Sequence, residues 1–311
     1  MPSRATAHSP LTGRRALVTG AAGFIGSALC RRLVASGTEV HGVSRVSRST
    51  ADGIRWWQAD LSEAGAANRI FREARPDVVF HLASHVSGDR GLGAVAPTLR
   101  DNLVTTVNLL TAAAEAGETR VVLAGSMEEP DRDDPAPSSP YAAAKTAASA
   151  YARLFDQLYG LPVVNLRVFM VYGPGQQDGT KLVPYVTNSL LRGEGPRLSS
   201  GRREVDWVYI DDVAAAFVAA AEAEKAPGSA LDIGSGELVS IRSLVERIVA
   251  LVGGDVRPEF GALPDRPGER PRVADLVPSR ELIGWEPSTP LDVGLARTVE
   301  WFRARVREGR V

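Results

Sequence analysis

The sequence predicts an α/β protein built on a parallel sheet with helices on both faces. Short apolar runs alternate with helix-length segments between residues 15 and 169. The first apolar run leads into a glycine-rich turn that opens into a helix. Helix-length connections between successive strands are what parallel pairing requires. With 311 residues and 44% hydrophobic content, the chain can bury one large core or two smaller ones.

Each predicted element follows from its local composition. Apolar runs rich in β-branched residues predict strands, and alanine-rich or amphipathic stretches that end near glycine predict helices. The predicted strands span residues 15–19, 39–44, 54–59, 76–84, 120–125 and 162–169. The predicted helices run from the glycine turn to residue 37, then over about 63–74, 97–116 and 141–159.

The texture changes after Phe169, where glycine–proline loops separate strand–turn–helix segments. We therefore expect an N-terminal domain over residues 13–172, to which segments near 205–235 return. A smaller C-terminal α/β region is expected over 173–311, and residues 1–12 are expected to form a flexible tail.

Composition excludes several classes of function. The net charge is −1, which does not suggest a nucleic-acid or membrane-surface protein. The N-terminus has no apolar signal segment, and no apolar run is long enough to span a bilayer. The single cysteine, Cys30, suits a reducing cytoplasm. Four histidines without metal-like spacing predict no metal site.

The turn after the first strand has phosphate-binding spacing. Gly20, Gly23 and Gly26 form G-x-x-G-x-x-G, with Phe24 and Ile25 between the last two glycines. Glycines let the backbone approach a pyrophosphate, and the following helix supplies amides and a positive dipole end. This strand–turn–helix context predicts a dinucleotide site.

The end of the second strand selects between cofactors. A carboxylate there would bind a ribose 2′-hydroxyl, but this chain has Ser44 and Arg45, with Arg48 close behind. A hydroxyl and guanidinium groups suit a 2′-phosphate. NADP(H) is therefore favoured, and NAD(H) is the alternative.

Tyr141 and Lys145 stand four positions apart in a helix-prone stretch, so they share one face. Such a pair arises by chance in many helices. Together with the other motifs, the sequence resembles the extended short-chain dehydrogenase/reductase family of nucleotide-sugar epimerases, dehydratases and ketoreductases. The matching segments are the glycine turn, Asp60-Leu61, His81–Ser84, Asn102, Ser126, the Tyr141/Lys145 pair, Arg167–Pro174, and the later motifs DWVYIDDVA, IGSG, RPGE and GWEP.

This resemblance implies a Rossmann-type doubly wound sheet, with a C-terminal region that mainly binds substrate. Tyr141 would be the general acid/base, Lys145 would lower its pKa and bind the nicotinamide ribose, and Ser126 would hydrogen-bond the reacting oxygen. Arg203 and Arg266 would bind the sugar-nucleotide diphosphate. The implied cofactor-binding residues are Gly20, Gly23, Phe24, Ile25, Gly26, Ser44, Arg45, Arg48, Asp60, Leu61, Leu82, Ala83, Ser84, Asn102, Tyr141, Lys145 and Val171.

Three departures from the family pattern bear on the reaction. Met127 follows Ser126 where dehydratases have an acid, although Glu128 can still act as a base. Only fifteen positions separate Ser126 from Tyr141, as in some deoxysugar 4-ketoreductases. Met170 replaces an asparagine that often binds the substrate diphosphate.

The leading hypothesis is an NADPH-dependent 4-ketoreductase acting on a nucleotide-activated 4-keto-6-deoxysugar. The alternative is a nucleotide-sugar 4-epimerase with tightly bound NAD. A dehydratase, and a non-catalytic cofactor-sensing protein, rank below these two.

We also expect a homodimer. The helices over 97–116 and 141–159 carry many alanines, and small residues allow close approach to a two-fold mate, as is common in this family. Ala148 and Ala152 are expected on the outward face, opposite the Tyr141/Lys145 pair.

Overall fold

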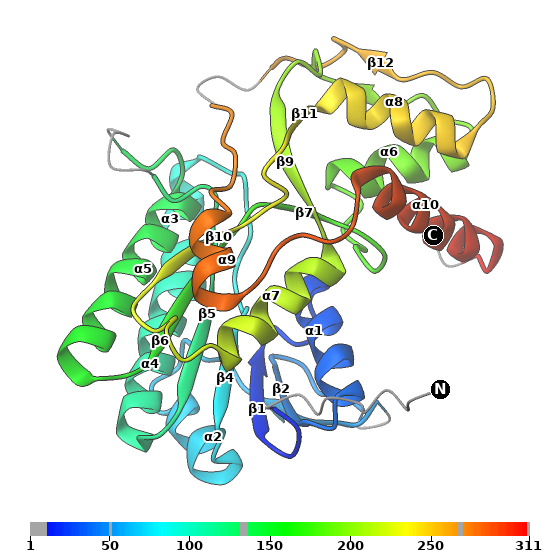
Figure 1. The fold of residues 1–311 in the computed structure, drawn as a ribbon. Helices are drawn as coiled ribbons and strands as arrows, with labels where there is room; N and C mark the ends of the chain where they lie inside the picture. Colours follow the sequence, from blue (N-terminus) through cyan, green and yellow to red (C-terminus); the bar gives the residue numbers. More distant parts are fainter. Residues whose placement is uncertain (1–10, 50–51, 131–135, 266–269, 310–311) are drawn as a thin grey trace. The chain divides into compact units, whose positions relative to one another are not determined.

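The computed structural model describes residues 11–49, 52–130, 136–265 and 270–309, and the chain divides into two compact units (Figure 1). The first unit contains residues 1–167, 214–231 and 281–284. The second contains residues 168–213, 232–280 and 285–311. Of the expected N-terminal tail, residues 1–10 lie outside the described residues.

The first unit is organised by a seven-stranded sheet of order β10-β6-β5-β4-β1-β2-β3. The registers of β1 with β2 and β4, of β2 with β3, and of β4 with β5 are all parallel. The predicted doubly wound α/β fold is thus confirmed. The strands are β1 (Arg15–Thr19), β2 (Glu39–Ser44), β3 (Ile54–Gln58), β4 (Val78–His81), β5 (Arg120–Ser126), β6 (Val163–Val168) and β10 (Ala230–Ile233).

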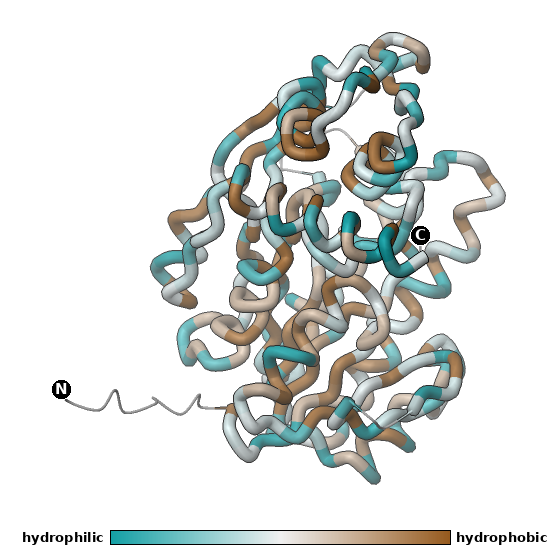
Figure 2. The backbone as a smooth tube through the Cα atoms, turned by 90° about the vertical axis from the view of Figure 1, so that its right-hand side faces the viewer, coloured by the Kyte–Doolittle hydropathy of each residue, from teal (hydrophilic) through white to brown (hydrophobic). Residues whose placement is uncertain are grey.

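Helices cover both faces of this sheet (Figure 1). On one face a core cluster joins Leu17 and Val79 of the strands to Ile70, Leu109 and Phe155 of the helices. Figure 2 shows hydrophobic and hydrophilic stretches alternating along the helices, as expected of elements that bury one side. The helices are α1 (Phe24–Ala35), α2 (Ala66–Ala74), α4 (Thr105–Ala116) and α5 (Pro140–Tyr159), while α7 (Ile210–Glu222) and α9 (Val277–Ile283) each cross the boundary between the units.

The predicted helix over 97–116 is not one regular helix. A short helix α3 (Val95–Thr98) leads into a π-helical segment, Leu99–Val104, and then into α4. One π-helical segment is unusual and often occurs at functional sites. It contains Asn102, which is 1% exposed.

The second unit has two small sheets of its own. In the larger sheet, β9 (Glu204–Tyr209) pairs in parallel with β7 (Met170–Tyr172) and antiparallel with β11 (Leu238–Ser240). The buried carboxylate of Asp206 accepts hydrogen bonds from the backbone amides of Ser235, Gly236 and Ala274. The remaining elements are β8 (Arg197–Leu198), β12 (Glu259–Phe260), α6 (Leu182–Leu191), α8 (Ile241–Val252) and α10 (Leu291–Arg307).

The expected outward placement of the α5 alanines is wrong. Ala148 and Ala152 are 6% and 4% exposed, because residues 141, 145, 148 and 152 share one helical face that packs inside the first unit. On α4, Ala112 and Ala113 belong to the buried core.

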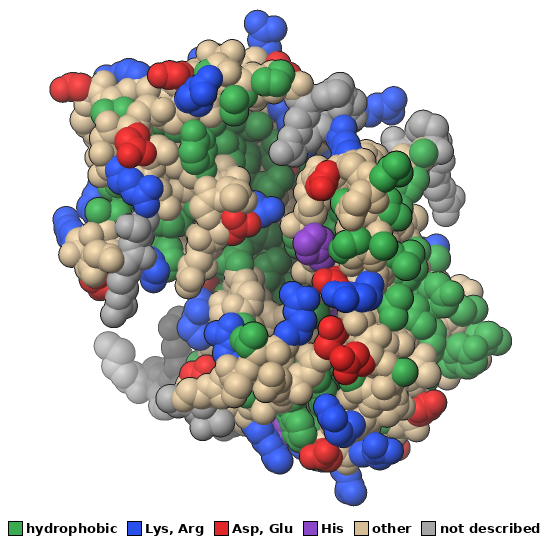
Figure 3. All heavy atoms as spheres, turned by 180° about the vertical axis from the view of Figure 1, so that it is seen from behind, with side chains coloured by type: hydrophobic (Ala, Val, Ile, Leu, Met, Phe, Trp, Pro, Cys, Tyr) green, Lys and Arg blue, Asp and Glu red, His purple; other side chains and the backbone are tan. Residues whose placement is uncertain are grey.

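The opposite face of α5 is apolar and exposed instead. Leu154 and Leu158 are 42% and 64% exposed, and Tyr151 lies on the same side. Leu99 of the π-helical segment and Leu92 before it are also exposed. Figure 3 shows hydrophobic side chains gathered on this side of the first unit. An exposed apolar patch of this kind is a candidate interaction surface.

Candidate functional site

The glycine turn connects β1 to α1 in the conformation that its spacing predicts. Gly20 has a φ of +65°, and a Cβ at that residue would lie 2.7 Å from the carbonyl carbon of Leu82. A Cβ at Gly26 would overlap the carbonyl oxygen of Gly20. Only glycine therefore allows the turn and the first helical turn to approach this closely.

The start of α1 is suited to an anion. Gly23 is the N-cap residue, no side chain caps the helix, and the first turn contains no acidic residue. Phe24 and Ile25 are the first two helical residues, so their amides have no partner within the helix. The amides and the positive end of the dipole fit a pyrophosphate at this position.

Arg45 and Arg48 are exposed cations in the loop after β2. Arg45 donates to the carboxylate of Asp101 at 3.3 Å, and its side chain is 67% exposed. Arg48 lies over the ring of Trp56, with its guanidinium carbon 5.9 Å from the ring centroid. Sequence analysis missed Asp101, because its only signal was a carboxylate beside Asn102. Arg45 is thus paired before any phosphate arrives.

Asp60 and Leu61 have local roles in the same region. The Asp60 carboxylate accepts the amide and the hydroxyl of Ser62 at 2.9 and 2.7 Å. Those two hydrogen bonds hold the pKa of Asp60 below its ordinary value. Leu61 is buried in the core, and Ser44 ends β2 with its hydroxyl accepting the amide of Val46. The structure therefore brings these residues together at one edge of the sheet.

Asn102 fixes the loop after β4. Its Oδ1 accepts the amide of His85 at 2.6 Å and the hydroxyl of Ser84 at 3.2 Å. Its Nδ2 donates to the carbonyl of His85 at 3.1 Å. Leu82 and Ala83 at the start of this loop bond to Thr19, immediately before the glycine turn. The π-helical segment thus positions the loop through a single amide.

A buried histidine joins the same loop to the glycine turn. Thr19 Oγ1 accepts the amide of Ala83, so its hydrogen points to Nδ1 of His81, 2.8 Å away. Nε2 of His81 is then the protonated nitrogen, 3.0 Å from Thr106 Oγ1, which donates to the carbonyl of Asn102. Burial lowers the pKa of His81 to about 3, and the charge of Lys145 adds to this effect.

Tyr141 and Lys145 lie on the buried face of α5. The helix begins at Pro140, and Ser139 caps it by accepting the amide of Ala142 at 3.0 Å. Both side chains are less than a tenth exposed, and Lys145 Nζ lies 5.8 Å from the centre of the Tyr141 ring. Lys145 also donates to the carbonyl of Ala124 at 2.7 Å, which ties α5 to β5.

Ser126 ends β5 beside this pair. It is 6% exposed, and the hydroxyls of Ser126 and Ser84 both act on the Tyr141 phenol to lower its pKa. A phenol, a serine hydroxyl and an ammonium therefore meet at the carboxyl end of the sheet. These groups can hold a carbonyl or alkoxide oxygen and exchange one proton with it.

Burial controls the charges of the pair. It raises the pKa of Tyr141 to about 12; hydrogen bonding with Ser126 acts against this, and the charges of Glu128 and Glu129 add to it. Burial also lowers the pKa of Lys145 to about 8, while the charge of Glu129 favours its protonated form. At neutral pH Tyr141 is therefore a proton donor beside an ammonium group.

The two glutamates after Ser126 differ in their surroundings. Glu128 is exposed; its amide donates to Ser126 Oγ at 3.1 Å, and its carboxylate accepts the hydroxyl of Ser139 at 3.3 Å. Glu129 is 6% exposed and accepts the amide of Ser126 at 2.8 Å. Met127, which stands between Ser126 and Glu128 in the sequence, is also buried. Sequence analysis selected Glu128 and missed Glu129, which no motif distinguished from its neighbour.

The remaining predicted residues belong to the second unit. Val171 lies in β7, and Arg203 is half-buried immediately before β9, where its carbonyl accepts the amide of Ile241. Arg266 lies outside the described residues. Met170 begins β7 and is partly buried.

Metal-binding clusters and membrane-spanning helices are both absent from the part of the chain that the structure describes. Within residues 11–49, 52–130, 136–265 and 270–309, no three His, Cys, Asp or Glu side chains are grouped to hold a metal ion. None of the helices in these ranges combines the length and apolar character needed to cross a membrane.

Comparison with known proteins identifies a family and relatives that match most of this chain. The model of the NAD dependent epimerase/dehydratase family matches residues 16–234. The UDP-glucose 4-epimerase of Mycolicibacterium smegmatis is 35% identical over 93% of this chain and 98% of that protein. A probable dTDP-glucose 4,6-dehydratase of Sinorhizobium fredii is 31% identical over 93% of this chain and 92% of that protein.

A solved structure agrees with these relatives. The UDP-glucose 4-epimerase of Thermotoga maritima with UDP-glucose superposes with a TM-score of 0.85. It is 30% identical and covers 94% of this chain and 99% of its own. The resemblance seen in the sequence motifs therefore extends to the whole fold.

Proposed function

The chain belongs to the NAD dependent epimerase/dehydratase family, and we propose that it transfers a hydride at one carbon of a nucleotide-activated sugar. The observation that carries the proposal is the buried Tyr141/Lys145 pair beside Ser126. A bound nicotinamide cofactor supplies or accepts the hydride. The glycine turn and the uncapped start of α1 would hold its pyrophosphate.

The protein's own groups handle the proton. Ser126 donates a hydrogen bond to the sugar oxygen, and Tyr141 gives that oxygen a proton as the carbonyl is reduced. The ammonium of Lys145 stabilises the phenolate left on Tyr141, because opposite charges attract strongly at a buried site. In the oxidative direction the same groups act in reverse.

We infer that the reaction is reduction of a nucleotide-activated 4-keto-6-deoxysugar. Its support is Ser44 and Arg45 at the end of β2, which suit the 2′-phosphate of NADPH, and the short connection between Ser126 and Tyr141. Net reduction consumes a free cofactor, so NADPH preference fits it. Met127 argues against dehydration, because a thioether cannot protonate a leaving hydroxyl.

A 4-epimerase is the second candidate, and a specific contact favours it. Asp101 already pairs with Arg45. Its carboxylate therefore lies beside the arginine proposed to bind the 2′-phosphate of NADPH, and it would repel that phosphate. The epimerase relative in Mycolicibacterium smegmatis and the NAD dependence in the family name point the same way.

The cofactor released on denaturation separates the two candidates. The purified protein is denatured, and the released nucleotide is identified and quantified. Stoichiometric NAD, with conversion of UDP-glucose to its C4 epimer without net cofactor use, identifies an epimerase. A protein that is empty and oxidises NADPH with a dTDP-4-keto-6-deoxysugar is a ketoreductase.

We also infer a homodimer formed by the exposed apolar face of α5. Leu154 and Leu158 provide apolar area that a two-fold mate would cover. The double change Leu154→Glu and Leu158→Glu is expected to yield monomers in light scattering at micromolar concentration. The single change Arg153→Glu, at an adjacent exposed position, serves as a charge control that remains dimeric. A monomeric parent chain would contradict the inference.

We also propose that the protein is located in the cytoplasm. Cys30 is the only cysteine, it is buried, and burial raises the pKa of its thiol to about 12. A thiol of this kind is inert and needs no oxidising compartment.

A further inference from the structure

Glu129 is a buried carboxylate for which the proposed chemistry has no use. One oxygen, Oε1, accepts the amide of Ser126 at 2.8 Å, and the other, Oε2, accepts the hydroxyl of Ser149. A Cβ at Gly125 would lie 2.5 Å from Oε1, so the strand leaves room for this carboxylate. Burying a charge is costly unless its hydrogen bonds are made, and here both oxygens have donors.

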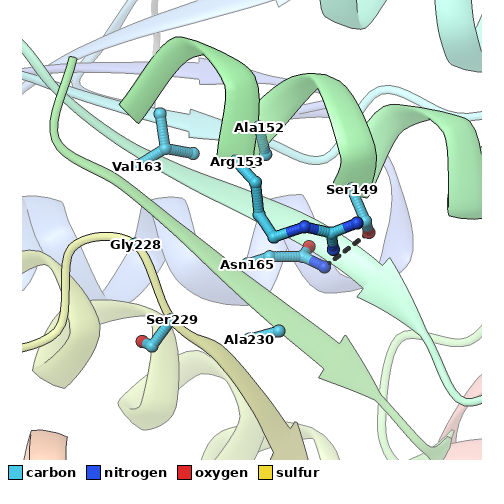
Figure 4. Close-up of a pocket in the computed structure, with 8 residues that line it drawn as sticks. All are labelled: Ser149, Ala152, Arg153, Val163, Asn165, Gly228, Ser229 and Ala230. Atoms are coloured by element: carbon cyan, nitrogen blue, oxygen red, sulfur yellow. Dashed lines mark hydrogen bonds between the residues drawn. The ribbon is translucent and has the colours of Figure 1, made fainter. Parts of the chain in front are cut away.

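The hydrogen bonds from Asn165 through Ser149 all donate towards the Glu129 carboxylate. Asn165 Nδ2 donates to Ser149 Oγ at 2.7 Å, so the Ser149 hydrogen points to Glu129. Figure 4 shows this bond between Asn165 and Ser149 on the wall of a small pocket beside Arg153. The pocket volume is about 10 Å³, room for about one water molecule and not for a substrate. The hydrogen bonds of Asn165, Ser149 and Glu129 therefore do not form a substrate-binding site and connect buried groups of the fold.

The network ends beside the proposed catalytic pair. Ser149 lies one helical turn after Lys145 on the same buried face of α5. Among the described residues, the titratable groups that face the Lys145 ammonium are Tyr141 of its own helix, His81 of β4 and Glu129 after β5. Tyr141 and His81 are neutral at pH 7, since the pKa of one is raised and that of the other lowered. Within this part of the chain, Glu129 is then the negative charge that acts on the Lys145 ammonium.

We propose that Glu129 is a positioning residue that fixes the backbone of Ser126 and keeps the ammonium of Lys145 charged beside Tyr141. This role rests on the proposed function of the Tyr141/Lys145 pair. Glu129 acts through its neighbours, since its two oxygens are occupied by Ser126 and Ser149. One carboxylate therefore connects the geometry of the hydroxyl donor to the charge of the ammonium.

The charge of Lys145 can be measured directly, because the chain has only three lysines, at positions 145, 181 and 225. The protein is labelled with lysine carrying ¹³C at Cε, and its three resonances are followed by NMR from pH 6 to pH 11. The Lys145 resonance is assigned by its loss in Lys145→Arg. Its midpoint in Glu129→Gln is expected about one pH unit below that of the parent chain.

Glutamine keeps the acceptor for the Ser126 amide and removes the charge. Lys181 and Lys225 are internal controls whose midpoints stay fixed. Ser149→Ala is the matched variant: it removes one hydrogen bond of Glu129 and leaves the charge, so the Lys145 midpoint stays near that of the parent. Glu129→Asp also keeps the charge and a midpoint near the parent value, even where the shorter side chain misplaces Ser126.

The result that overturns the proposal is an unchanged Lys145 midpoint in Glu129→Gln, or an equal drop in Ser149→Ala or Glu129→Asp. Turnover gives a second readout. For a one-unit drop in midpoint, kcat of Glu129→Gln falls about fivefold at pH 8 and little at pH 6. The NMR midpoint needs no substrate. A failure of the proposed function, seen as full turnover in Tyr141→Phe, is therefore distinct from a failure of this role for Glu129.

Discussion

We call the surroundings of Tyr141, Lys145 and Ser126 the catalytic end, and the loop after β2 with Arg45 and Arg48, where the adenosine of the cofactor is proposed to bind, the adenosine end. These two regions of the first unit are built in opposite ways. Tyr141, Lys145 and Ser126 are all less than a tenth exposed, and secondary structure holds each of them. At the adenosine end, the Arg45 side chain is 67% exposed and lies in a loop after β2. Buried groups have fixed partners and perturbed pKa values, whereas exposed charges are screened by water. Changes at the catalytic end should therefore have larger effects than changes at the adenosine end.

Replacing Tyr141 by phenylalanine is expected to have the largest effect. The change removes the proton donor and leaves the apolar ring, so the fold and cofactor affinity stay near those of the parent. Turnover should fall by roughly two to four orders of magnitude. Steady-state kinetics and cofactor titration measure the two quantities separately. Near-normal turnover would show that Tyr141 is not the proton donor. It would also contradict the expectation that changes at the catalytic end have the larger effects.

His81, behind the catalytic end, should make stability depend on pH. Its pKa is about 3 in the folded chain, against an ordinary value of 6.5, so the unfolded chain binds an extra proton between these values. Stability is therefore unaffected by His81 above pH 6.5 and falls as pH drops from 6.5 towards 3. The loss between pH 7.5 and pH 5 is about 2 kcal/mol.

Urea unfolding at these two pH values tests the contribution of His81. His81→Asn should be less stable than the parent at pH 7.5, because it loses a buried hydrogen bond, but should lose less stability on acidification. His85→Asn is the matched control, since His85 is exposed. Equal acid sensitivity of the parent and His81→Asn would show that His81 does not titrate as inferred.

Changes at the adenosine end should have the smallest effects. Because Arg45 is exposed and already paired with Asp101, Arg45→Ala should weaken NADPH only about three- to tenfold, and NADH hardly at all. Asp101→Asn should act in the opposite direction and strengthen NADPH, because it removes a repelling carboxylate. Fluorescence titration of each cofactor measures both changes.

Arg48→Ala is the control for this end. Its guanidinium lies over Trp56, so its loss should change NADPH and NADH affinity to the same small extent. If Arg45→Ala weakens the two cofactors equally, Arg45 does not bind the 2′-phosphate. A loss above a hundredfold would instead show that this end becomes buried and rigid when the cofactor binds.

Much of the fold could be predicted because its signals are local. Apolar runs and helix-length connections predicted the parallel sheet, and strand β1 and the start of α1 lie where the glycine turn predicts. The π-helical segment Leu99–Val104 could not be predicted, because its sequence is helix-compatible throughout. The hydrogen bonds of Asn102 with Ser84 and His85, residues distant in sequence, accompany that distortion.

The two faces of α5 are the reverse of those expected from its alanine content, since Ala148 and Ala152 are buried and Leu154 and Leu158 are exposed. The spacing that places Tyr141 and Lys145 together also places Ala148 and Ala152 with them, so periodicity alone predicts a shared face. The expectation of an outward alanine face ignored this periodicity. The structure instead exposes Leu154 and Leu158, and the dimer prediction now rests on these larger side chains.

The sequence by itself determined the order of the elements, the glycine turn and the spacing of Tyr141 and Lys145, because each depends on residues within a few positions of one another. Only the tertiary structure decided which of two adjacent glutamates is buried and which carboxylate meets Arg45. Those outcomes depend on contacts between elements distant along the chain: Glu129 is held by Ser149 of α5, and Arg45 by Asp101 of the π-helical segment. Burial and partnership set the charge of a side chain, and both arise only when distant segments pack together.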